Sequence, residues 1–423
     1  MKKIKPPKER KPIKTQAQEG TLIGHRGRRP IYIPDDAKHA FICGTTGSGK
    51  TVALSNFIKR AMEKEYPLPI IDGKGDTGAG SLLDIVHILN RQHKRKVYVI
   101  NLSDPASSDK YNPFKNASPT MAKDMIINMT DWSEEHYKLN TERYIQRLLQ
   151  LLERARIQFS FNKIIKHIPI EKFKELSGDL LKAELITKEE HTENMEISNT
   201  SGKITQGSMA RFSTIAESEV GSIFSDDGID LSQALQEKAI ILFILNPLIY
   251  PELSPAFGRL ILIDTKKAIG SLFKSNIGKT FLIMDEINVY ASPVLTDLVN
   301  KSRSAGVTCI LSTQSLSDLD YACGEAYKEQ IIENCNNYVV MRQNSGINAD
   351  HWSNILGTKA TMEVTYQLQQ KGLDTSATGF GSAKRVREYL YHPDDIKTLQ
   401  TGQGIFLSRD MGTNSKIDVN KPF

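Results

Sequence analysis

The chain has 423 residues, of which 39% are hydrophobic and 25% are charged. These proportions are typical of a soluble globular protein, and the length suggests two or three domains. No run of 18 or more apolar residues and no signal peptide is present in the sequence, so neither a transmembrane helix nor secretion by a cleaved leader is expected. The four cysteines form no CxxC pair and no zinc-ligand spacing, so Cys43 and Cys309, which lie in apolar runs, are expected to be reduced core residues.

The net charge of +6 comes from the beginning of the chain. Residues 1–40 hold 11 Lys and Arg against 4 Asp and Glu, which leaves 44 basic and 45 acidic residues in the rest. Residues 1–20 combine Lys and Pro without an apolar run, so a disordered basic tail is predicted there. The tail is either simply solvated or touches nucleic acid or anionic lipid.

Short apolar runs of strand length recur along the chain, with helical or irregular segments between them. Buried parallel strands have this character because helices cover both faces of their sheet. The pattern predicts an α/β doubly wound fold. The predicted strands are Ala40–Cys43, Leu68–Asp72, Val97–Asn101, Ala239–Leu245, Thr280–Met284, Val307–Ser312, Tyr338–Met341 and Gly404–Ser408.

The first predicted strand leads into GTTGSGKT, which fits the P-loop pattern G-x-x-x-x-G-K-[ST] and precedes a helical run at Val52–Lys64. Glycines let main-chain N–H groups turn toward phosphate oxygens, and the helix directs its positive end at the same anion. Lys50 is expected to neutralise the β- and γ-phosphates of ATP, and Thr51 to ligate Mg²⁺. The alternative is a glycine-rich turn followed by Lys-Thr by chance. The predicted nucleotide-binding residues are Gly44, Thr45, Thr46, Gly47, Ser48, Gly49, Lys50 and Thr51.

The second predicted strand ends in a charged segment, Ile70–Asp76. This segment is either close to the nucleotide or an ordinary surface turn.

The middle of the chain interrupts the alternation of strands and helices. No convincing strand occurs between Ala117 and Glu219, and apolar residues follow helical spacing over Thr141–Phe159 and Ile170–Leu185. An all-α insertion over residues 117–219 is therefore predicted between two parts of one nucleotide-binding domain, residues 21–116 and 220–423. Its role is either to read cargo or to stabilise the fold as a helical cap. A later Gly-, Ser- and Thr-rich stretch, Gly372–Lys384, is predicted to be a mobile loop.

Two acids follow the apolar run Phe281–Met284. An acid at the carboxyl end of a buried strand lies where open α/β sheets bind ligands. Asp285 is therefore expected to hold the Mg²⁺ shell, and Glu286 to act as general base on the attacking water. The alternative is a strand that ends in two solvated acids.

Gln314 follows the next predicted strand and is a candidate sensor of the γ-phosphate, or simply a polar residue at a strand end. Arg303 lies between these two strands at the end of a predicted helix. It is a candidate arginine finger that reaches the γ-phosphate of a neighbouring subunit, or a solvated helix cap.

Taken together, these segments resemble the type IV coupling proteins, the TraD/TraG-like branch of the HerA–FtsK motor superfamily. The matching segments are Gly24 with the strand Pro30–Ile33, GTTGSGKT, IIDGKGD, IFSDDGIDLSQAL, FLIMDE, SRSAGVTCILSTQS and YLYHPDDIKTLQTGQGIFLS. The resemblance implies a RecA-like P-loop domain with a central, mostly parallel sheet, interrupted by an all-α domain. It also implies a homohexameric ring that drives DNA through its centre, and it places Arg303 at the finger position.

The function expected from the resemblance is that of an ATPase that delivers relaxase-bound DNA to a conjugative type IV secretion channel. The expected partners are DNA of any sequence, the relaxase or relaxosome, and components of the secretion system. The family usually carries amino-terminal transmembrane helices, whereas none is expected from this sequence. We therefore expect a cytoplasmic protein that partners recruit to the inner face of the membrane.

Two other functions fit parts of the sequence. One is a HerA/FtsK-like DNA motor for repair, segregation or genome packaging. The other is a nucleotide-gated adaptor that recruits substrates through its all-α domain and hydrolyses little ATP. The Asp285–Glu286 pair argues against the adaptor.

Overall fold

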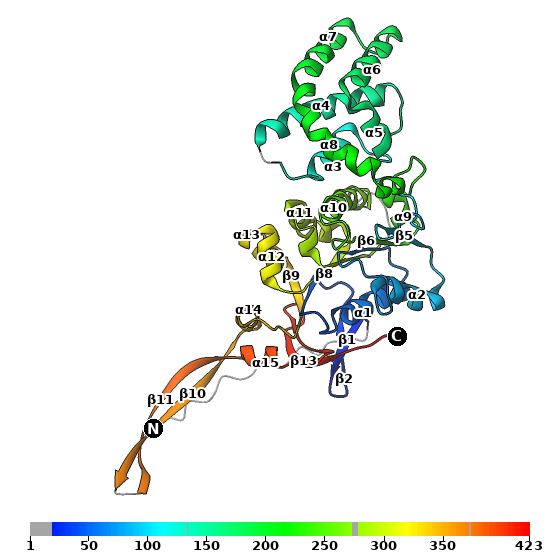
Figure 1. The fold of residues 1–423 in the computed structure, drawn as a ribbon. Helices are drawn as coiled ribbons and strands as arrows, with labels where there is room; N and C mark the ends of the chain where they lie inside the picture. Colours follow the sequence, from blue (N-terminus) through cyan, green and yellow to red (C-terminus); the bar gives the residue numbers. More distant parts are fainter. Residues whose placement is uncertain (1–18, 133, 273–277, 372–373) are drawn as a thin grey trace.

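A computed structural model describes residues 19–132, 134–272, 278–371 and 374–423, so the predicted basic tail lies almost wholly outside the described residues. A sheet of 11 strands in this part of the chain forms the centre of the molecule (Figure 1). Its strand order is β2-β1-β13-β12-β9-β3-β8-β7-β4-β6-β5. The run from β9 to β5 is parallel throughout, whereas β2, β1, β13 and β12 add an antiparallel edge. The predicted α/β fold with a mostly parallel sheet is confirmed.

All of the predicted strands are present, with ends that differ by up to three residues. The largest difference is at β9, which begins at Cys335 and not at Tyr338. The strands of the sheet are β1 Thr21–Arg26, β2 Arg29–Ile33, β3 His39–Cys43, β4 Leu68–Asp72, β5 Val97–Asn101, β6 Ile240–Ile244, β7 Thr280–Asp285, β8 Val307–Thr313, β9 Cys335–Met341, β12 Gln403–Ser408 and β13 Thr413–Val419.

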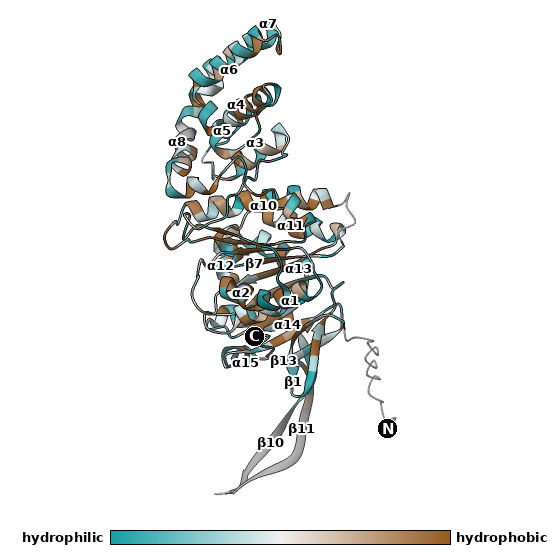
Figure 2. Cartoon of the chain, turned by 90° about the vertical axis from the view of Figure 1, so that its right-hand side faces the viewer, coloured by the Kyte–Doolittle hydropathy of each residue, from teal (hydrophilic) through white to brown (hydrophobic). Residues whose placement is uncertain are grey.

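Two apolar clusters cover the two faces of the sheet, because successive strand side chains point to opposite sides. Ile42 and Ile283 pack with α1 (Lys50–Glu63) and α2 (Leu82–His93) on one face. Phe41 and Met284 belong to the larger cluster on the other face, which the remaining helices of the nucleotide domain cover. Figure 2 shows brown, apolar residues concentrated on the central strands and on α10. The helices of the nucleotide domain that pack on the larger apolar cluster are α9 Leu231–Gln236, α10 Leu253–Leu272, α11 Pro293–Ser302, α12 Leu316–Cys323, α13 Glu325–Asn334, α14 Gly346–Leu356 and α15 Pro393–Lys397.

The interruption of the sheet by helices is also confirmed. Helices α3 to α8 lie together at one end of the molecule (Figure 1). They join the larger apolar cluster through residues such as Tyr144 and Leu148. They are α3 Pro119–Asn128, α4 Glu135–Arg154, α5 Phe161–His167, α6 Ile170–Lys182, α7 Lys188–Ile197 and α8 Lys203–Glu217.

The chain enters and leaves this helical segment at neighbouring points. Tyr111 forms isolated bridges with Phe224 and Ile229. The fully buried Asp264 of α10 accepts a hydrogen bond from the Tyr111 hydroxyl at 2.6 Å and forms an ion pair with Lys267 at 2.7 Å. Lys267 also donates to the carbonyl oxygen of Pro113 at 2.7 Å. A buried charged pair therefore ties the entering linker to α10.

Two helices end earlier than the apolar spacing predicted. The run Thr141–Phe159 is helical only to Arg154, because Arg156 takes a positive φ of 54° and Ile157 N–H bonds back to Leu152 O. The run to Leu185 ends at Lys182 in the same way, since Glu184 has a φ of 57°. After α4 the next apolar residue, Ile157, packs against the larger apolar cluster, whereas Leu185 after α6 is exposed.

The prediction of a mobile loop over Gly372–Lys384 is wrong from Asp374 onward. Strand β11 (Asp374–Tyr389) pairs antiparallel with β10 (Thr358–Lys371) in a long hairpin. Residues 372 and 373 lie outside the described residues. The Gly-, Ser- and Thr-rich composition predicted a loop, but the main-chain N–H and C=O groups of this segment form hydrogen bonds with β10. The hairpin projects from the end of the molecule opposite α3–α8 (Figure 1).

Cys43 and Cys309 are buried free thiols, as predicted. In the described part of the chain, no helix has the length and apolar character needed to cross a membrane.

Candidate functional site

The P-loop connects β3 to α1 at the carboxyl edge of the sheet, between β8 and β9. Gly47 and Gly49 have φ values of 76° and 109°, where a side chain would strain the backbone. A Cβ on Gly44 would come within 2.6 Å of the Ser48 hydroxyl oxygen. The glycines of the motif are therefore required by the shape of the loop, which presents main-chain N–H groups and the amino end of α1 to one point.

Lys50 is held inside this loop and is only 9% exposed. Its Nζ donates to the carbonyl oxygen of Gly44 at 2.8 Å and lies 3.2 Å from Oε1 of Glu286. The two residues come from elements that are 236 positions apart, and the sheet brings them together. A phosphate entering the loop would compete with Glu286 for this ammonium group.

Glu286 follows β7 in a strained conformation, with a φ of 46° that is rare for a residue with a side chain. Burial and the neighbouring Asp285 raise the pKa of its carboxyl group, and Lys50 partly offsets this. Its Oε2 is buried without a hydrogen-bond partner among the described residues. An unpartnered carboxylate oxygen with a raised pKa is suited to accept a proton from water.

Asp285 is buried beside a second carboxylate that the sequence had placed only in a charged segment. Asp72 at the end of β4 pairs in register with Asp285. Burial, and then the charge of Asp285, raise the pKa of Asp72 to about 7. The Ser312 hydroxyl donates to Asp285 Oδ1 from the adjacent strand. The segment after β4 thus contributes to the site and is not an unrelated surface turn.

The oxygen groups at this edge fit Mg²⁺. This ion prefers one or two carboxylates, with phosphate oxygens and water completing an octahedral shell. Asp285, Asp72 and the hydroxyl of Ser312 supply such oxygens, and Thr51 is the second residue of α1. Among the described residues, no group of three or more His, Cys, Asp or Glu could hold a metal ion.

Gln314 joins the same site. Its Oε1 accepts a hydrogen bond from the Thr46 hydroxyl at 3.1 Å, and its side chain is near enough to Glu286 to act against the rise in the pKa of that carboxyl group. It therefore contacts both the P-loop and the expected general base, as a sensor would need to do.

Arg303 lies elsewhere. It begins a short 3-10 helix before β8, at the amino end of the strand whose carboxyl end carries Gln314. It is exposed, and the seven residues of β8 place it on the order of 20 Å from the P-loop. Arg303 therefore cannot act on the nucleotide of its own subunit, and any catalytic role requires a neighbouring one.

Several residues that frame the P-loop were missed from the sequence. Arg342 follows β9, its carbonyl oxygen accepts from Thr45 N–H at 2.9 Å, and its Nε is buried with no partner in the described residues. From the closing segment, Thr401 donates to Gly47 O at 3.0 Å and Gly402 N–H donates to Ser48 O at 2.8 Å. The rule that located Gln314, a polar residue just after a predicted strand, would also have found Arg342.

Comparison with known proteins gives a consistent result. Residues 25–417 match the family described as the type IV secretion-system coupling protein DNA-binding domain. An uncharacterised protein of Mycoplasma pneumoniae is 31% identical over 104 residues, which are 25% of this chain and 69% of that protein.

The fold is shared with solved structures of low sequence identity. The bacterial conjugative coupling protein TrwBdeltaN70 aligns with a TM-score of 0.67 and 15% identity over 96% of this chain and 90% of its own. The plasmid coupling protein TrwB in complex with ADP and Mg²⁺ aligns with a TM-score of 0.65 and 16% identity. This alignment covers 97% of the present chain and 90% of the TrwB chain. VirB4 of Thermoanaerobacter pseudethanolicus aligns with a TM-score of 0.57 and 12% identity, over 96% of the present chain and 97% of the VirB4 chain.

Proposed function

Because the chain belongs to the type IV secretion-system coupling protein family, we propose that it is an ATP-driven DNA translocase that delivers DNA to a conjugative secretion channel. The observation that carries this proposal is the convergence of the P-loop, Asp285, Glu286 and Gln314 at one edge of the sheet. TrwB, which shares the fold, has been solved with ADP and Mg²⁺ and with an ATP analogue.

In the proposed reaction, the P-loop binds the phosphates of ATP through its main-chain N–H groups and Lys50. The ammonium of Lys50 then leaves Glu286, whose carboxylate becomes free to take a proton from the attacking water. Asp285 and Thr51 would hold Mg²⁺ together with the phosphates, and the ion would supply charge neutralisation there. Gln314 links the state of Glu286 to Thr46 in the P-loop.

Movement along DNA requires contacts that do not depend on base sequence. A motor must grip every sequence that it meets, so it should contact phosphates more than base edges. Beyond residue 40 the chain is close to neutral, which suggests few contacts per subunit, summed around a ring. We propose a homohexamer, with the relaxase–DNA complex and secretion components as partners and with recruitment to the inner face of the membrane through them.

The test is ATP hydrolysis by the full chain with and without DNA, measured together with the oligomeric state. We expect DNA of any sequence to stimulate hydrolysis, with affinity that falls steeply as salt rises. ATP binding without turnover would instead favour the nucleotide-gated adaptor. A fixed preference for one short sequence that persists at high salt would contradict a translocating motor.

A further inference from the structure

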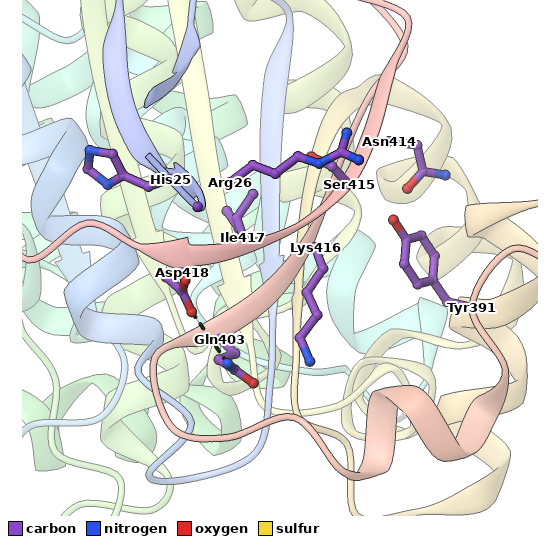
Figure 3. A pocket seen from close by; sticks show the side chains of 10 residues that line it. His25, Arg26, Tyr391, Gln403, Asn414, Ser415, Lys416, Ile417 and Asp418 are labelled. Carbon is purple, nitrogen blue, oxygen red and sulfur yellow. Dashed lines mark hydrogen bonds between the residues drawn. The ribbon is translucent and has the colours of Figure 1, made fainter. Parts of the chain in front are cut away.

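A polar cleft of about 440 Å³ opens where β1 separates from β13, on the part of the sheet farthest from the all-α helices (Figures 1 and 3). Arg26 and His25 come from the end of β1, and Lys416 comes from β13. Tyr391 stands opposite, on the segment that follows the long hairpin. None of these residues contributes to the nucleotide site.

The floor of the cleft is a strand edge that has no partner strand in the described part of the chain. Val419 N–H donates to Gly402 O on the β12 side, so the alternation of a strand points the main-chain groups of Asp418, Lys416 and Asn414 the other way. On that side, β1 pairs with β13 only at Gly24↔Val419 and His25↔Asp418. The main chain at Lys416 and Asn414 is therefore beyond the β1 ladder.

A side chain occupies one position that a further strand would fill. Tyr391 lies close to Lys416 in the cleft, and the Lys416 main chain partly offsets the burial that raises the pKa of Tyr391 (Figure 3). An added strand would take the place of this side chain. The tyrosine thus protects an edge that would otherwise be open to pairing.

Two buried polar groups in the cleft also have no partner among the described residues. They are Oδ1 of Asn414 and Oγ of Ser415, and Ser415 is only 4% exposed. The amide nitrogen of Asn414 is fixed by Leu356 O at 2.8 Å, so its oxygen cannot turn away to find another donor. Unpaired buried polar groups are costly and indicate a ligand that supplies hydrogen bonds.

The charge of the cleft selects among possible ligands. His25, Arg26 and Lys416 face one acid, Asp418, which accepts a hydrogen bond from Gln403. The chain's own first 20 residues hold 7 Lys and Arg against 2 Glu, so like charges disfavour them as the occupant. Nucleic acid would match the charge, but its phosphodiester chain cannot continue a β-ladder.

We propose that this cleft binds an acidic, extended segment of a partner protein, which pairs with the free edge of β13 as an added strand. Main-chain hydrogen bonds to Lys416 and Asn414 give affinity, as in other cases of strand addition. Arg26 and the Lys416 side chain select carboxylates, and Asn414 Oδ1 with Ser415 Oγ receive the remaining polar contacts.

The experiment is to pan a library of displayed random dodecapeptides on the full-length protein and to measure the selected peptides by fluorescence anisotropy. We expect acidic sequences, and we expect proline at alternate positions to abolish binding because it removes main-chain donors. The pair Arg26→Glu, Lys416→Glu should weaken binding at least tenfold. The matched pair Arg91→Glu, Lys94→Glu on α2, also exposed bases, should leave binding unchanged.

Unchanged ATP hydrolysis and melting temperature in both double variants will show that they are folded. The proposal is overturned if acidic peptides are not enriched, or if their binding survives the Arg26→Glu, Lys416→Glu change. It is also overturned if that change instead reduces binding of a 20-nucleotide single strand or of phosphatidylglycerol vesicles, which would assign the cleft to DNA or lipid. The assay needs no ATP, so its failure is distinct from a failure of the proposed ATPase.

Discussion

Glu286 and Lys50 form the closest contact between the P-loop and the strand that carries the expected general base. Their carboxylate and ammonium groups neutralise each other at 3.2 Å while both are almost fully buried. Breaking this pair without replacement would leave a buried charge, which is strongly unfavourable. A phosphate that replaces Glu286 as the partner of Lys50 avoids this cost, so nucleotide binding and release of the base are expected to occur together.

Glu286→Gln should bind ATP but hydrolyse it at least about 10²-fold more slowly, because the amide cannot accept a proton. Filter binding of labelled ATP and single-turnover hydrolysis would measure the two effects separately. Lys50→Ala serves as the contrasting variant and should lose binding itself. Turnover by Glu286→Gln at the wild-type rate would refute the assignment.

Arg342→Gln should reduce turnover by about 10²-fold with little change in ATP affinity. A loss of about 10²-fold in turnover is typical when one hydrogen-bond donor to the transition state is removed. The reason is that its main chain contacts the P-loop at Thr45, and its Nε is buried with no partner among the described residues. Retention of ADP–aluminium fluoride would be measured alongside turnover and should fall in parallel. Arg385→Gln on the exposed hairpin is the control, and equal turnover in the two variants would exclude a phosphate contact.

Asp72→Asn should stabilise the nucleotide-free protein in a pH-dependent way. Burial raises the pKa of Asp72 to about 7, so the wild-type folded state is penalised as the group ionises. The gain in melting temperature should be absent below about pH 4, should grow up to about pH 7 and should be constant above it. A gain that is independent of pH would show that Asp72 is not the titrating group.

At the scale of elements, the helical segment is attached by two adjacent linkers and by contacts across its base. Asp131, between α3 and α4, forms a two-pronged pair with Arg259 of α10 at 2.7 and 2.9 Å. Tyr250, in the loop after β6, donates to Glu219 at 2.6 Å. The loop begins at Leu245 and Asn246, which pack against Gly75 beside Asp72. The helices therefore contact a loop that starts at the nucleotide site.

Replacing residues 117–219 with a short Gly/Ser linker should leave ATP binding intact and abolish the stimulation of hydrolysis by DNA. The linkers meet at Tyr111 and Phe224, so a short connection can close the gap without moving the sheet. ATP affinity and DNA-dependent turnover are the two readouts. Loss of ATP binding would identify the segment as a stabilising cap, and DNA transfer that survives the deletion would refute a role in reading cargo.

At the scale of the whole molecule, Arg303 lies at the opposite edge of the sheet from the P-loop of its own chain. The buried His39 holds this region, since it accepts from Cys309 N–H at 3.0 Å and bonds to Val299 O at 2.8 Å. If this exposed arginine acts on a nucleotide, that nucleotide must belong to another subunit.

Arg303→Ala should bind ATP normally but lose about 10³-fold or more in turnover, the range of arginine fingers in other nucleotide hydrolases. Mixed with Lys50→Ala subunits, it should regain part of the activity, because an intact finger then faces an intact P-loop. Coassembly would be verified with differently tagged subunits. Mixed rings that coassemble but stay inactive would argue against action between subunits.

The sequence alone determined the features that depend on short stretches of chain. The P-loop, the strand ending in Asp285 and Glu286, and the central strands are local patterns, since glycine freedom, apolar runs and strand-end acids are set within a few residues. Periodicity also located the helical segment. It overran the helix ends at Arg154 and Lys182, because a single residue of positive φ terminates each helix without disturbing the apolar spacing.

Other features depend on which strands lie next to each other, and these became visible only in the three-dimensional structure. Placing β4 next to β7 brought Asp72 against Asp285 and raised its pKa, and placing β9 next to β3 brought Arg342 to the P-loop. The same holds for the β10–β11 hairpin, which needed a pairing partner, and for the cleft, which exists because β1 leaves β13 after two pairs. Apart from the hairpin ladder, these features arise from contacts between residues hundreds of positions apart, and no local pattern of side chains specifies such contacts.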